Sequence, residues 1–364
     1  MDSFAFIIHP IDAKRDVSRK FPFLGRVLTE GQIDFFSTFF PPVYISEIEG
    51  IRSQATGKEI KGWFLACPYT PKRMLQLPER TVYRKIVQTG RMAEKLGANI
   101  LGLGAFTSVV GDAGVTIANG LEIPVTTGDS FTVAMAVQAI RDAALVMDIK
   151  IEEATVAVVG ATGTIGRVCA ELIAGEAART LLVARDEKKL EVLRDRLQLK
   201  SRSELVISTK MDVLKEAQLI LTVTSSIHDV IRPEYLQAGS VVCDVARPRD
   251  VSAMVAAVRD DILVIDGGMV DVPGSVNFHF NFGFPEGKVY ACMAETIALA
   301  LEGRFEDYTV GRDITLERVQ EITAIADKHG FRMSGFRSFE REVTDEQIET
   351  VRKNARMGVR ARRG

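Results

Sequence analysis

Short apolar runs alternate with amphipathic segments between residues 154 and 270. The runs are five to eight residues long and rich in β-branched side chains, which is typical of buried parallel strands. Segments 167–178 and 186–198, which separate the first three runs, have helical spacing. This alternation predicts an α/β fold with a doubly wound parallel Rossmann sheet, which binds ligands at the carboxyl ends of its strands. The predicted strands are 155–160, 180–185, 205–209, 219–226, 240–246 and 262–266.

The first 150 residues have a different pattern. Two strand-like runs flank the turn-forming sequence QATGK, and a basic helical segment and a loop rich in glycine and hydroxyl residues follow. A chain of 364 residues, 46% of them hydrophobic, is long enough for two buried cores. We expect an α/β substrate domain at 1–150, the Rossmann domain at 151–284, and a helical segment at 285–364 whose helices return toward the substrate domain.

Composition narrows the class of partner. The formal net charge is only −2, from 46 basic and 48 acidic residues, so the charge balance predicts no nucleic acid partner. Four widely spaced cysteines without a CxxC pair indicate a reducing compartment, with neither a disulfide framework nor a zinc site. The chain lacks an uninterrupted run of about 18 apolar residues, so we expect a cytoplasmic protein without a transmembrane segment.

Three glycines follow the first predicted strand and open the first helix. Glycines at these positions permit a tight turn and a close approach to a pyrophosphate, and the helix start supplies free N–H groups and a partial positive charge. The alternative is a purely structural turn. The residues predicted to bind a dinucleotide here are Gly160, Thr162, Gly163, Thr164, Ile165 and Gly166.

The residue after the second strand indicates which dinucleotide binds. NAD-specific domains place an acidic residue about 20 positions beyond the glycines, where it bonds the ribose hydroxyls. This chain has Arg185 there, and an arginine can pair with the 2′-phosphate of NADP(H). We therefore expect NADP(H), although a solvated arginine is the alternative. Thr224 and Ser225, at the end of the fourth strand, would contact the nicotinamide end or merely cap the next helix.

Each of the four cysteines has a different setting. Cys67, Cys169 and Cys243 lie in apolar surroundings that favour core packing. Cys292 instead follows a glycine-rich loop and begins a helix, with Lys288 nearby. A helix amino terminus and a nearby cation favour a thiolate, the form that attacks thioesters. The residues alone leave both a nucleophile and a packed thiol open for Cys292.

Seven motifs are spread along the chain: AKRDVSR at 13–19, ATGK at 55–58, LGAFTS at 103–108, TTG at 126–128, ATVAVVGATG at 154–163, IDGG at 265–268 and YACMAE at 290–295. With these motifs the chain resembles the cyanobacterial-type long-chain fatty acyl-ACP reductases, which use NADPH to make fatty aldehydes. The resemblance implies that Cys292 forms the acyl-enzyme, that NADPH hydride then releases the aldehyde, and that acyl carrier protein and an aldehyde-consuming enzyme are partners. Two departures are Thr164, where that family carries an acidic residue, and the extended tail after residue 337.

An acyl-enzyme mechanism needs donors for an oxyanion and a source of protons. Two hydroxyl-rich loops after strand ends suggest Thr107, Ser108, Thr127 and Ser130 as donors, although such hydroxyls also cap turns. His279 is a candidate to protonate the leaving group, with packing between phenylalanines as the alternative.

Three surface features bear on partners. The segment from Lys72 to Lys95 contains seven basic residues and only two acidic ones. This excess of positive charge suggests that an acidic carrier docks on Lys72, Arg73, Arg80, Arg84 and Lys85. The last twelve residues before Gly364 include six basic residues and no acid, typical of a solvated disordered tail, with contact to a membrane surface as the alternative. An acyl tunnel or the core would use Phe35, Phe36, Phe39, Phe40, Phe278, Phe280 and Phe282.

Other functions fit the same Rossmann pattern. Shikimate-type and glutamyl-tRNA reductase-type NADP(H) dehydrogenases have two domains as well, but the lysine and cysteine motifs expected of them in the amino-terminal half do not occur in this sequence. A non-catalytic NADPH-sensing protein would keep the fold without needing Cys292.

Overall fold

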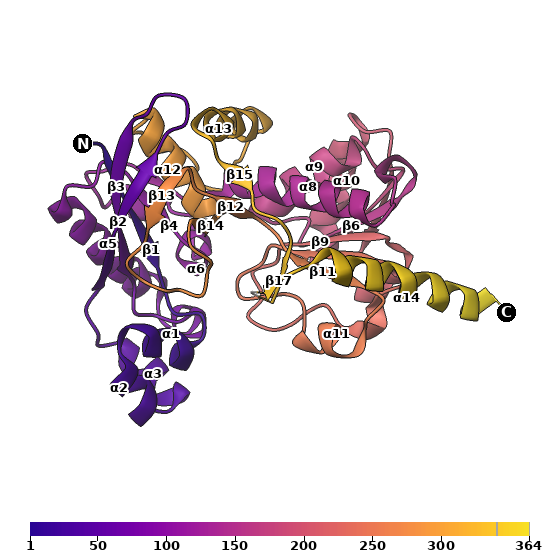
Figure 1. Ribbon diagram of the computed structural model, residues 1–364, viewed down its shortest axis with the longest axis horizontal. Coiled ribbons are helices and arrows are strands. Elements are labelled where there is room, and N and C mark those ends of the chain that lie inside the picture. Colours follow the sequence, from indigo (N-terminus) through magenta and orange to yellow (C-terminus); the bar gives the residue numbers. More distant parts are fainter. Residues whose placement is uncertain (340, 364) are drawn as a thin grey trace. The chain divides into compact units, whose positions relative to one another are not determined.

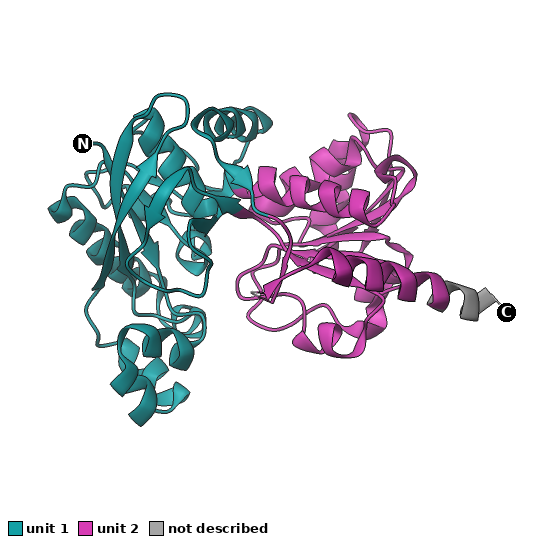
Figure 2. Ribbon diagram, viewed as in Figure 1, with its two compact units in different colours: residues 1–131, 270–334 teal, residues 132–269, 335–364 magenta. Residues whose placement is uncertain are grey.

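The computed structural model describes residues 1–339 and 341–363, with side chains described as far as 357. The chain forms two compact units (Figure 2). Unit 1 comprises Met1–Phe131 and Val270–Ser334, and unit 2 comprises Thr132–Met269 and Gly335–Gly364. The chain therefore passes between the units three times, after residues 131, 269 and 334. These positions differ from the domain boundaries at 150 and 284 that we predicted.

Unit 2 is built on a six-stranded parallel sheet with the order β8-β7-β6-β9-β10-β11. The first strand, β6, lies inside the sheet and the chain winds outward from it in both directions, as in doubly wound dinucleotide-binding domains. The Rossmann fold and its six predicted strands are confirmed. Their bounds are β6 Thr155–Val159, β7 Arg179–Val183, β8 Glu204–Ser208, β9 Leu219–Thr222, β10 Val241–Asp244 and β11 Leu263–Asp266.

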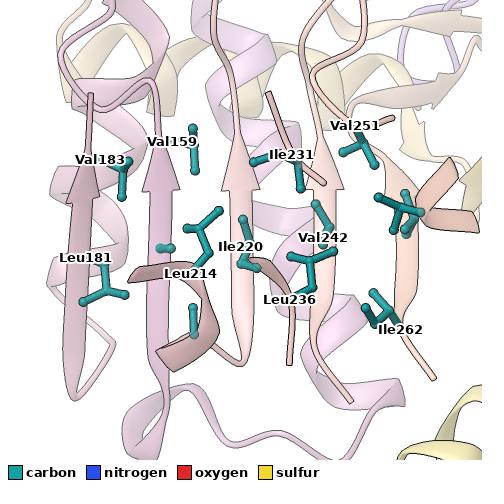
Figure 3. Packing of buried hydrophobic residues seen from close by; sticks show 14 residues of the cluster. Val159, Leu181, Val183, Leu214, Ile220, Ile231, Leu236, Val242, Val251 and Ile262 are labelled. Carbon is teal, nitrogen blue, oxygen red and sulfur yellow. The ribbon is translucent and has the colours of Figure 1, made fainter. Parts of the chain in front are cut away.

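The core of unit 2 explains the apolar runs in its sequence. Parallel strands are covered on both faces, so consecutive side chains are buried alternately on one face and the other. Figure 3 shows buried residues on one face of the sheet, among them Val159, Leu181, Ile220 and Val242 on four different strands. Helices that connect these strands are α9 Thr164–Ala174, α10 Glu187–Gln198 and α11 Ala253–Val258.

Unit 1 has a mixed six-stranded sheet with the order β13-β2-β3-β1-β4-β5. β2 (Val43–Arg52) and β3 (Glu59–Ala66) form an antiparallel hairpin around the predicted QATGK turn. β13 (Gly274–Asn277) pairs antiparallel with β2, while β1 (Ser3–Ile8), β4 (Leu101–Leu103) and β5 (Val125–Thr126) continue the sheet in parallel from β3. The carboxyl ends of β1, β4 and β5 therefore share one edge of the unit.

Two helices cover opposite faces of this sheet. A Cβ on Gly102 would lie 2.2 Å from Thr296 Oγ1, so Gly102 of β4 faces α12 (Ala291–Glu302). Leu101, its neighbour in the strand, faces Gly90 of α5 (Glu79–Leu96). Because adjacent residues of a strand point to opposite faces, α12 and α5 lie on different sides of the sheet. α12 thus returns from the end of the chain to unit 1, as we predicted, and Figure 1 shows it beside these strands.

The remaining helices and strands complete both units. α8 (Asp129–Val146) begins in unit 1 and continues in unit 2. In unit 1 the others are α1 Ala13–Lys20, α2 Pro22–Val27, α3 Glu30–Ser37, α4 Pro71–Gln76, α6 Phe106–Val109, α7 Val115–Ala118, α13 Leu316–His329, β14 Lys288–Tyr290 and β15 Arg332–Met333. β12 (Met269–Asp271) pairs antiparallel with β15. Unit 2 also contains β16 Arg337–Ser338, β17 Arg341–Glu342, α14 Asp345–Arg363 and the 3₁₀ turns Ile151–Glu153, Met211–Glu216 and Pro233–Tyr235.

The end of the chain differs from the solvated tail that we predicted. α14 packs on unit 2, where Arg352 pairs with Asp148 and Asn354 donates a hydrogen bond of 3.2 Å to the Asp260 carbonyl. These contacts order a segment whose charge pattern alone is typical of disorder. The side chains of Arg360, Arg362 and Arg363 lie outside the described residues. Within the described chain, no helix is long and apolar enough to cross a membrane.

Candidate active site

Cys292 lies where the carboxyl ends of the parallel strands of unit 1 meet the start of α12. It is the second residue of that helix, after the N-cap residue Tyr290 and Ala291. The loop after β5 packs directly on it, because a Cβ on Gly128 would lie 2.3 Å from the Cys292 Cα. Gly128 also has a φ of +77°, which side chains rarely adopt. Contact and conformation therefore both require glycine at position 128.

The loop after β4 contacts Cys292 from another strand. The backbone amides of Ala105 and Met293 hydrogen-bond the sulfur and favour its thiolate. Ala105 has a φ of +47°, a strained conformation of the kind that clusters at functional sites. His9, directly after β1, secures this loop: its Nε2 accepts a 2.9 Å hydrogen bond from the Phe106 amide. Burial lowers the His9 pKa to about 4, so the ring is neutral. Sequence reasoning missed His9.

Glu295, one turn beyond Cys292 on α12, anchors the loop after β5. Its carboxylate is fully buried and accepts hydrogen bonds from the hydroxyls of Thr126 and Thr309 and from the Phe131 amide. The Gly128 amide also stabilises it. An acid in the middle of an apolar helical segment, four residues after its first residue Ala291, is the signal in the sequence that points to it. Glu295 fixes the loop and the cysteine to the same helix.

The electrostatics of Cys292 differ from our expectation. Burial, together with the charges of Asp129 and Glu295, raises its pKa to about 12. The cation that we expected to assist, Lys288, instead bonds Asp271 and Ser334, each at 2.6 Å. The prediction of a thiolate stabilised by this lysine was wrong. At rest Cys292 is a thiol, and its reaction requires a group that removes the proton.

Asp129, the first residue of α8, is the other titratable group at this position. Its side chain is 5% exposed, and burial together with the charge of Glu295 raises its pKa to about 7. The Thr127 hydroxyl lowers the same pKa. Our sequence reading passed over Asp129, because nothing in its local pattern shows that a carboxyl is buried beside a cysteine.

The predicted oxyanion donors lie in the two loops, but most of their hydroxyls are already engaged. Thr107 and Ser108 donate to the carbonyls of Gly104 and Ala105, at 2.8 and 2.7 Å, which is the turn-capping role. Ser130 contacts the Thr309 hydroxyl at 2.9 Å. Thr127 is buried beside Asp129. The structure brings Ser108 and Thr127 to the loops around Cys292, and it uses the Ser108 proton inside its own turn.

The structure does not bring His279 to Cys292. His279 follows β13, the edge strand, and its Nε2 lies 3.1 Å from Glu49 of β2. In the sheet order, β2, β3 and β1 separate β13 from β4, whose loop contacts Cys292. The prediction that His279 protonates the leaving group is therefore wrong, because the sheet holds it at the opposite edge.

The glycine loop of unit 2 fits a dinucleotide. Gly160 has a φ of +86°, and a Cβ there would lie 2.6 Å from the Val223 carbonyl, so the loop packs where β6 meets β9. A Cβ on Gly166 would lie 2.1 Å from the Gly160 oxygen. Gly163 is exposed and is the N-cap of α9, without a side-chain cap. The first amides of α9, at Thr164 and Ile165, are therefore available to donate hydrogen bonds to a pyrophosphate bound at the start of the helix.

The other predicted cofactor residues have different roles. Arg185 is exposed directly after β7, as expected for a contact with the adenosine ribose. Thr224 is engaged by Asp250, which accepts hydrogen bonds from its amide and hydroxyl. Residues 224–226 do not begin a helix, so Thr224 does not cap one. Ser225 is exposed beside it.

The basic segment in unit 1 is only partly available. Arg73 donates a 2.8 Å bond to the buried carboxylate of Asp34, and Lys85 donates a 2.7 Å bond to the Phe40 carbonyl. These two side chains hold α4 and α5 to the region of α3, so their assignment to a docking surface is corrected. Lys72, Arg80 and Arg84 are exposed.

Aromatic rings form a continuous series in unit 1. The centroids of Phe64 and Phe282 lie 4.6 Å apart, those of Phe282 and Phe284 5.2 Å, and those of Phe284 and Tyr290 4.7 Å. The series includes Phe278 and Phe280 and ends at the N-cap residue of the Cys292 helix. Phe35, Phe36 and Phe39 are instead exposed on and after α3, so they do not line a tunnel. Phe40 is half-buried.

Cys67, Cys169 and Cys243 are buried, as predicted, whereas Cys292 is partly exposed. Burial raises the pKa of Cys67 and of Cys169 to about 12. In the part of the chain that the structure describes, no group of three or more His, Cys, Asp or Glu side chains is arranged to hold a metal ion.

The long-chain acyl-(acyl-carrier-protein) reductase of Synechococcus elongatus is 30% identical to this chain over 337 residues, covering 88% of this chain and 95% of that protein. The chain belongs to the long-chain acyl-(acyl-carrier-protein) reductase family. This membership confirms the resemblance that the motifs indicated. Together with the Rossmann fold, it identifies an oxidoreductase that uses a nicotinamide cofactor.

Other matches cover parts of the chain or are more distant. Aminotransferase PigE of a Serratia species is 32% identical over 305 residues, but this chain spans only 36% of its length. The shikimate / quinate 5-dehydrogenase family model matches residues 142–266, which include the glycine loop and exclude Cys292. L-tryptophan dehydrogenase from Nostoc punctiforme, a solved structure, is similar over 97% of this chain and 88% of its own, with 11% identity and a TM-score of 0.43.

Proposed function

We propose that this protein uses NADPH to reduce a long-chain acyl thioester of acyl carrier protein to a fatty aldehyde, through an acyl-enzyme on Cys292. The proposal is carried by one observation. The partly exposed cysteine of the chain begins α12 and is contacted by loops from the carboxyl ends of β4 and β5. Family membership supplies the substrate class, because the Synechococcus relative is named for acyl-carrier-protein thioesters.

The residues of unit 1 perform the acyl transfer. The Cys292 sulfur attacks the thioester carbonyl, and the carrier thiol leaves. Cys292 lies in the first turn of α12, so the first-turn amides and the positive end of the helix dipole favour the oxyanion that forms. The fixed contacts of Gly128 and Ala105 orient the sulfur, and an oriented nucleophile lowers the barrier by removing the entropy of alignment.

The acyl chain would follow the ring series that runs from Phe64 to Tyr290. These rings form a connected apolar surface that ends at the helix of Cys292, and most of its members are half-buried. Apolar area of this extent favours a long hydrocarbon over a short one, at about 0.8 kcal/mol for each buried methylene group.

The glycine loop of unit 2 would hold the dinucleotide, with the start of α9 on the pyrophosphate and Arg185 on the 2′-phosphate. Bound NADPH supplies a hydride. We expect Arg185→Glu to weaken NADPH binding far more than NADH binding, because only NADPH carries the added phosphate. Titration of both nucleotides tests this, with Arg194→Glu on α10 as the control. Equal losses for the two nucleotides would disprove the assignment.

The acyl-enzyme is tested without NADPH. Intact mass spectrometry after incubation with long-chain acyl-ACP should show one acyl adduct on the wild-type chain and on Cys169→Ala, and none on Cys292→Ala. An adduct that survives Cys292→Ala would refute the proposal. A wild-type chain that binds NADPH and forms no adduct would support a sensing protein instead.

Docking of the acidic carrier is proposed for Lys72, Arg80 and Arg84, the exposed members of the basic segment. Charge reversal of Arg80 and Arg84 should raise KM for acyl-ACP and leave KM for acyl-CoA nearly unchanged. The same reversal at Arg196 in unit 2 is the control. A parallel rise for both substrates would show that these residues act on something other than the carrier.

A further inference from the structure

Three acidic groups meet at the start of α12: the Cys292 thiol and the carboxyls of Asp129 and Glu295. The residue before Asp129 touches Cys292, since a Cβ on Gly128 would lie 2.4 Å from the Cys292 Cβ. The charge of Asp129 acts on the sulfur more strongly than any other group, after burial itself. Like charges this close in a buried site cannot all ionise, so the groups must share protons.

Hydrogen bonds decide which carboxyl stays charged. Burial raises the pKa of Glu295, but hydrogen bonds from two hydroxyls and from backbone amides oppose this rise, because donors stabilise the charged form of a carboxyl. Asp129 has one such stabilising contact, from Thr127, and it faces the charge of Glu295. Of the pair, Asp129 is therefore the carboxyl that gains and loses a proton.

The histidines of unit 1 do not serve Cys292. His9 donates and accepts within the backbone, and its low pKa keeps it neutral. His279 is bonded to Glu49 at the far edge of the sheet. His329 lies between Ser53 and Glu302, at 2.8 and 2.7 Å. Asp129 is the titratable group that the structure places beside the sulfur.

We propose that Asp129 is the acid–base residue of this site, which takes the proton of the Cys292 thiol and gives it to the departing carrier thiolate. This inference rests on the proposed function. It adds a catalytic residue to that reaction. It also explains why a carboxyl is buried next to the cysteine, because a carboxylate without an acid–base role would only disfavour the thiolate of Cys292.

The protons balance through both half-reactions. In the first, the S–H bond of Cys292 breaks, its proton moves to Asp129, the new C–S bond forms, and the carrier sulfur leaves with its electron pair and takes that proton. In the second, NADPH held by the glycine loop and Arg185 would supply a hydride to the carbonyl carbon, and the C–S bond to Cys292 would break with its electron pair on sulfur. Asp129 ends the first half-reaction as the anion, so it takes a proton from solvent and then gives it to the leaving sulfur. This step restores the Cys292 thiol and the Asp129 carboxylate.

The pKa of Asp129, about 7, suits this role because a group titrating near neutral pH both accepts and donates protons. The groups acting on it are Glu295 and Cys292 from α12 and Thr127 from its own loop. Below pH 7 Asp129 holds its proton and cannot act as a base. Acylation of Cys292 should therefore rise with pH and level off above 7.

The experiment follows the acyl adduct by intact mass, without NADPH, from pH 5.5 to 9. Asp129→Asn keeps the shape of the side chain and removes its titration. We expect adduct formation at pH 7.5 to fall roughly a hundredfold and the inflection near 7 to vanish. Asp12→Asn, which changes another carboxyl at a helix start of unit 1, should behave as wild type. Thermal melting and NADPH titration check that the variants fold.

The outcomes separate this inference from the proposed function. If the wild type forms the adduct and Asp129→Asn forms it within threefold of the same rate, Asp129 is not the base, although Cys292 remains the nucleophile. If the wild type forms no adduct, both proposals fail. Should Asp129→Asn not fold, the wild-type profile still decides: a rate that climbs tenfold per pH unit to pH 9, without levelling, would overturn the role of Asp129.

Discussion

At the scale of single residues, the backbone of Gly128 helps to position Cys292. Gly128 lies against the cysteine with a positive φ, and Glu295 holds its loop by several hydrogen bonds. Gly97 has a similar φ of +84° at the end of α5, but a Cβ there meets nothing within 4 Å. An alanine at Gly97 would therefore introduce backbone strain alone, whereas an alanine at Gly128 would introduce the same strain and a clash with Cys292.

Gly128→Ala should lower the rate of Cys292 acylation roughly a hundredfold, because the new methyl group must displace the backbone of the nucleophile. Gly97→Ala should lower stability by about 1 kcal/mol through strain alone and leave acylation unchanged. The time course of the acyl adduct and thermal melting measure the two effects. Equal acylation by both variants would show that the contact at Gly128 does not position Cys292.

The sequence identified individual residues unequally. The glycine loop was predictable because three glycines between a strand and a helix have a physical reason to be there. Cys292 stood out only through resemblance, because the local pattern was equally compatible with packing. Asp129, Glu295 and His9 were missed because their roles depend on burial, which joins segments far apart in the chain. Lys288 was misjudged for the same reason, since its partner Asp271 belongs to another strand.

At the scale of elements, strands were predicted well and the ends of helices less well. Alternation of β-branched runs and helices specifies a parallel sheet, and the hairpin of β2 and β3 has its own turn sequence. The four-residue helix α6 carries no such signal in the sequence. Its start depends instead on His9 of another segment, which accepts from the Phe106 amide.

His9 makes this element sensitive to pH. Its pKa is about 4 in the folded chain and 6.5 in the unfolded chain, so the stabilisation is complete above pH 6.5 and is lost as the pH falls toward 4. At pH 5 the free energy of unfolding should have fallen by about 2 kcal/mol from this source. His9→Gln should remove that part of the pH dependence.

The measurement uses Trp63, the one tryptophan of the chain, which lies in β3 of unit 1. Urea unfolding followed by its fluorescence at pH 7 and pH 5 reports on unit 1, and carboxyl groups contribute equally to wild type and variant. His228→Gln, at an exposed position of unit 2, is the control and should keep the wild-type dependence. Parallel stability curves for wild type and His9→Gln would contradict the role given to His9.

At the scale of the whole molecule, the two units are interleaved in the sequence, which no local pattern could show. Unit 1 takes α12 and β13 from beyond residue 270, while α14 belongs to unit 2. Our predicted boundaries followed the order of elements along the chain. They failed where an apolar helix returns to cover a sheet formed much earlier.

This interleaving predicts which fragments fold. Fragment 132–269 contains the complete sheet of unit 2 and should show a cooperative thermal transition by circular dichroism, because its core is closed within one segment. Fragment 1–150 lacks α12, so the face of its sheet that carries Phe6 and Gly102 is uncovered, and it should melt without a cooperative transition. Adding a 270–334 peptide should restore one, whereas a 335–364 peptide should not. A cooperative transition of 1–150 alone would mean that α12 is dispensable to the sheet, and Cys292 would then belong to a segment that docks on a finished domain.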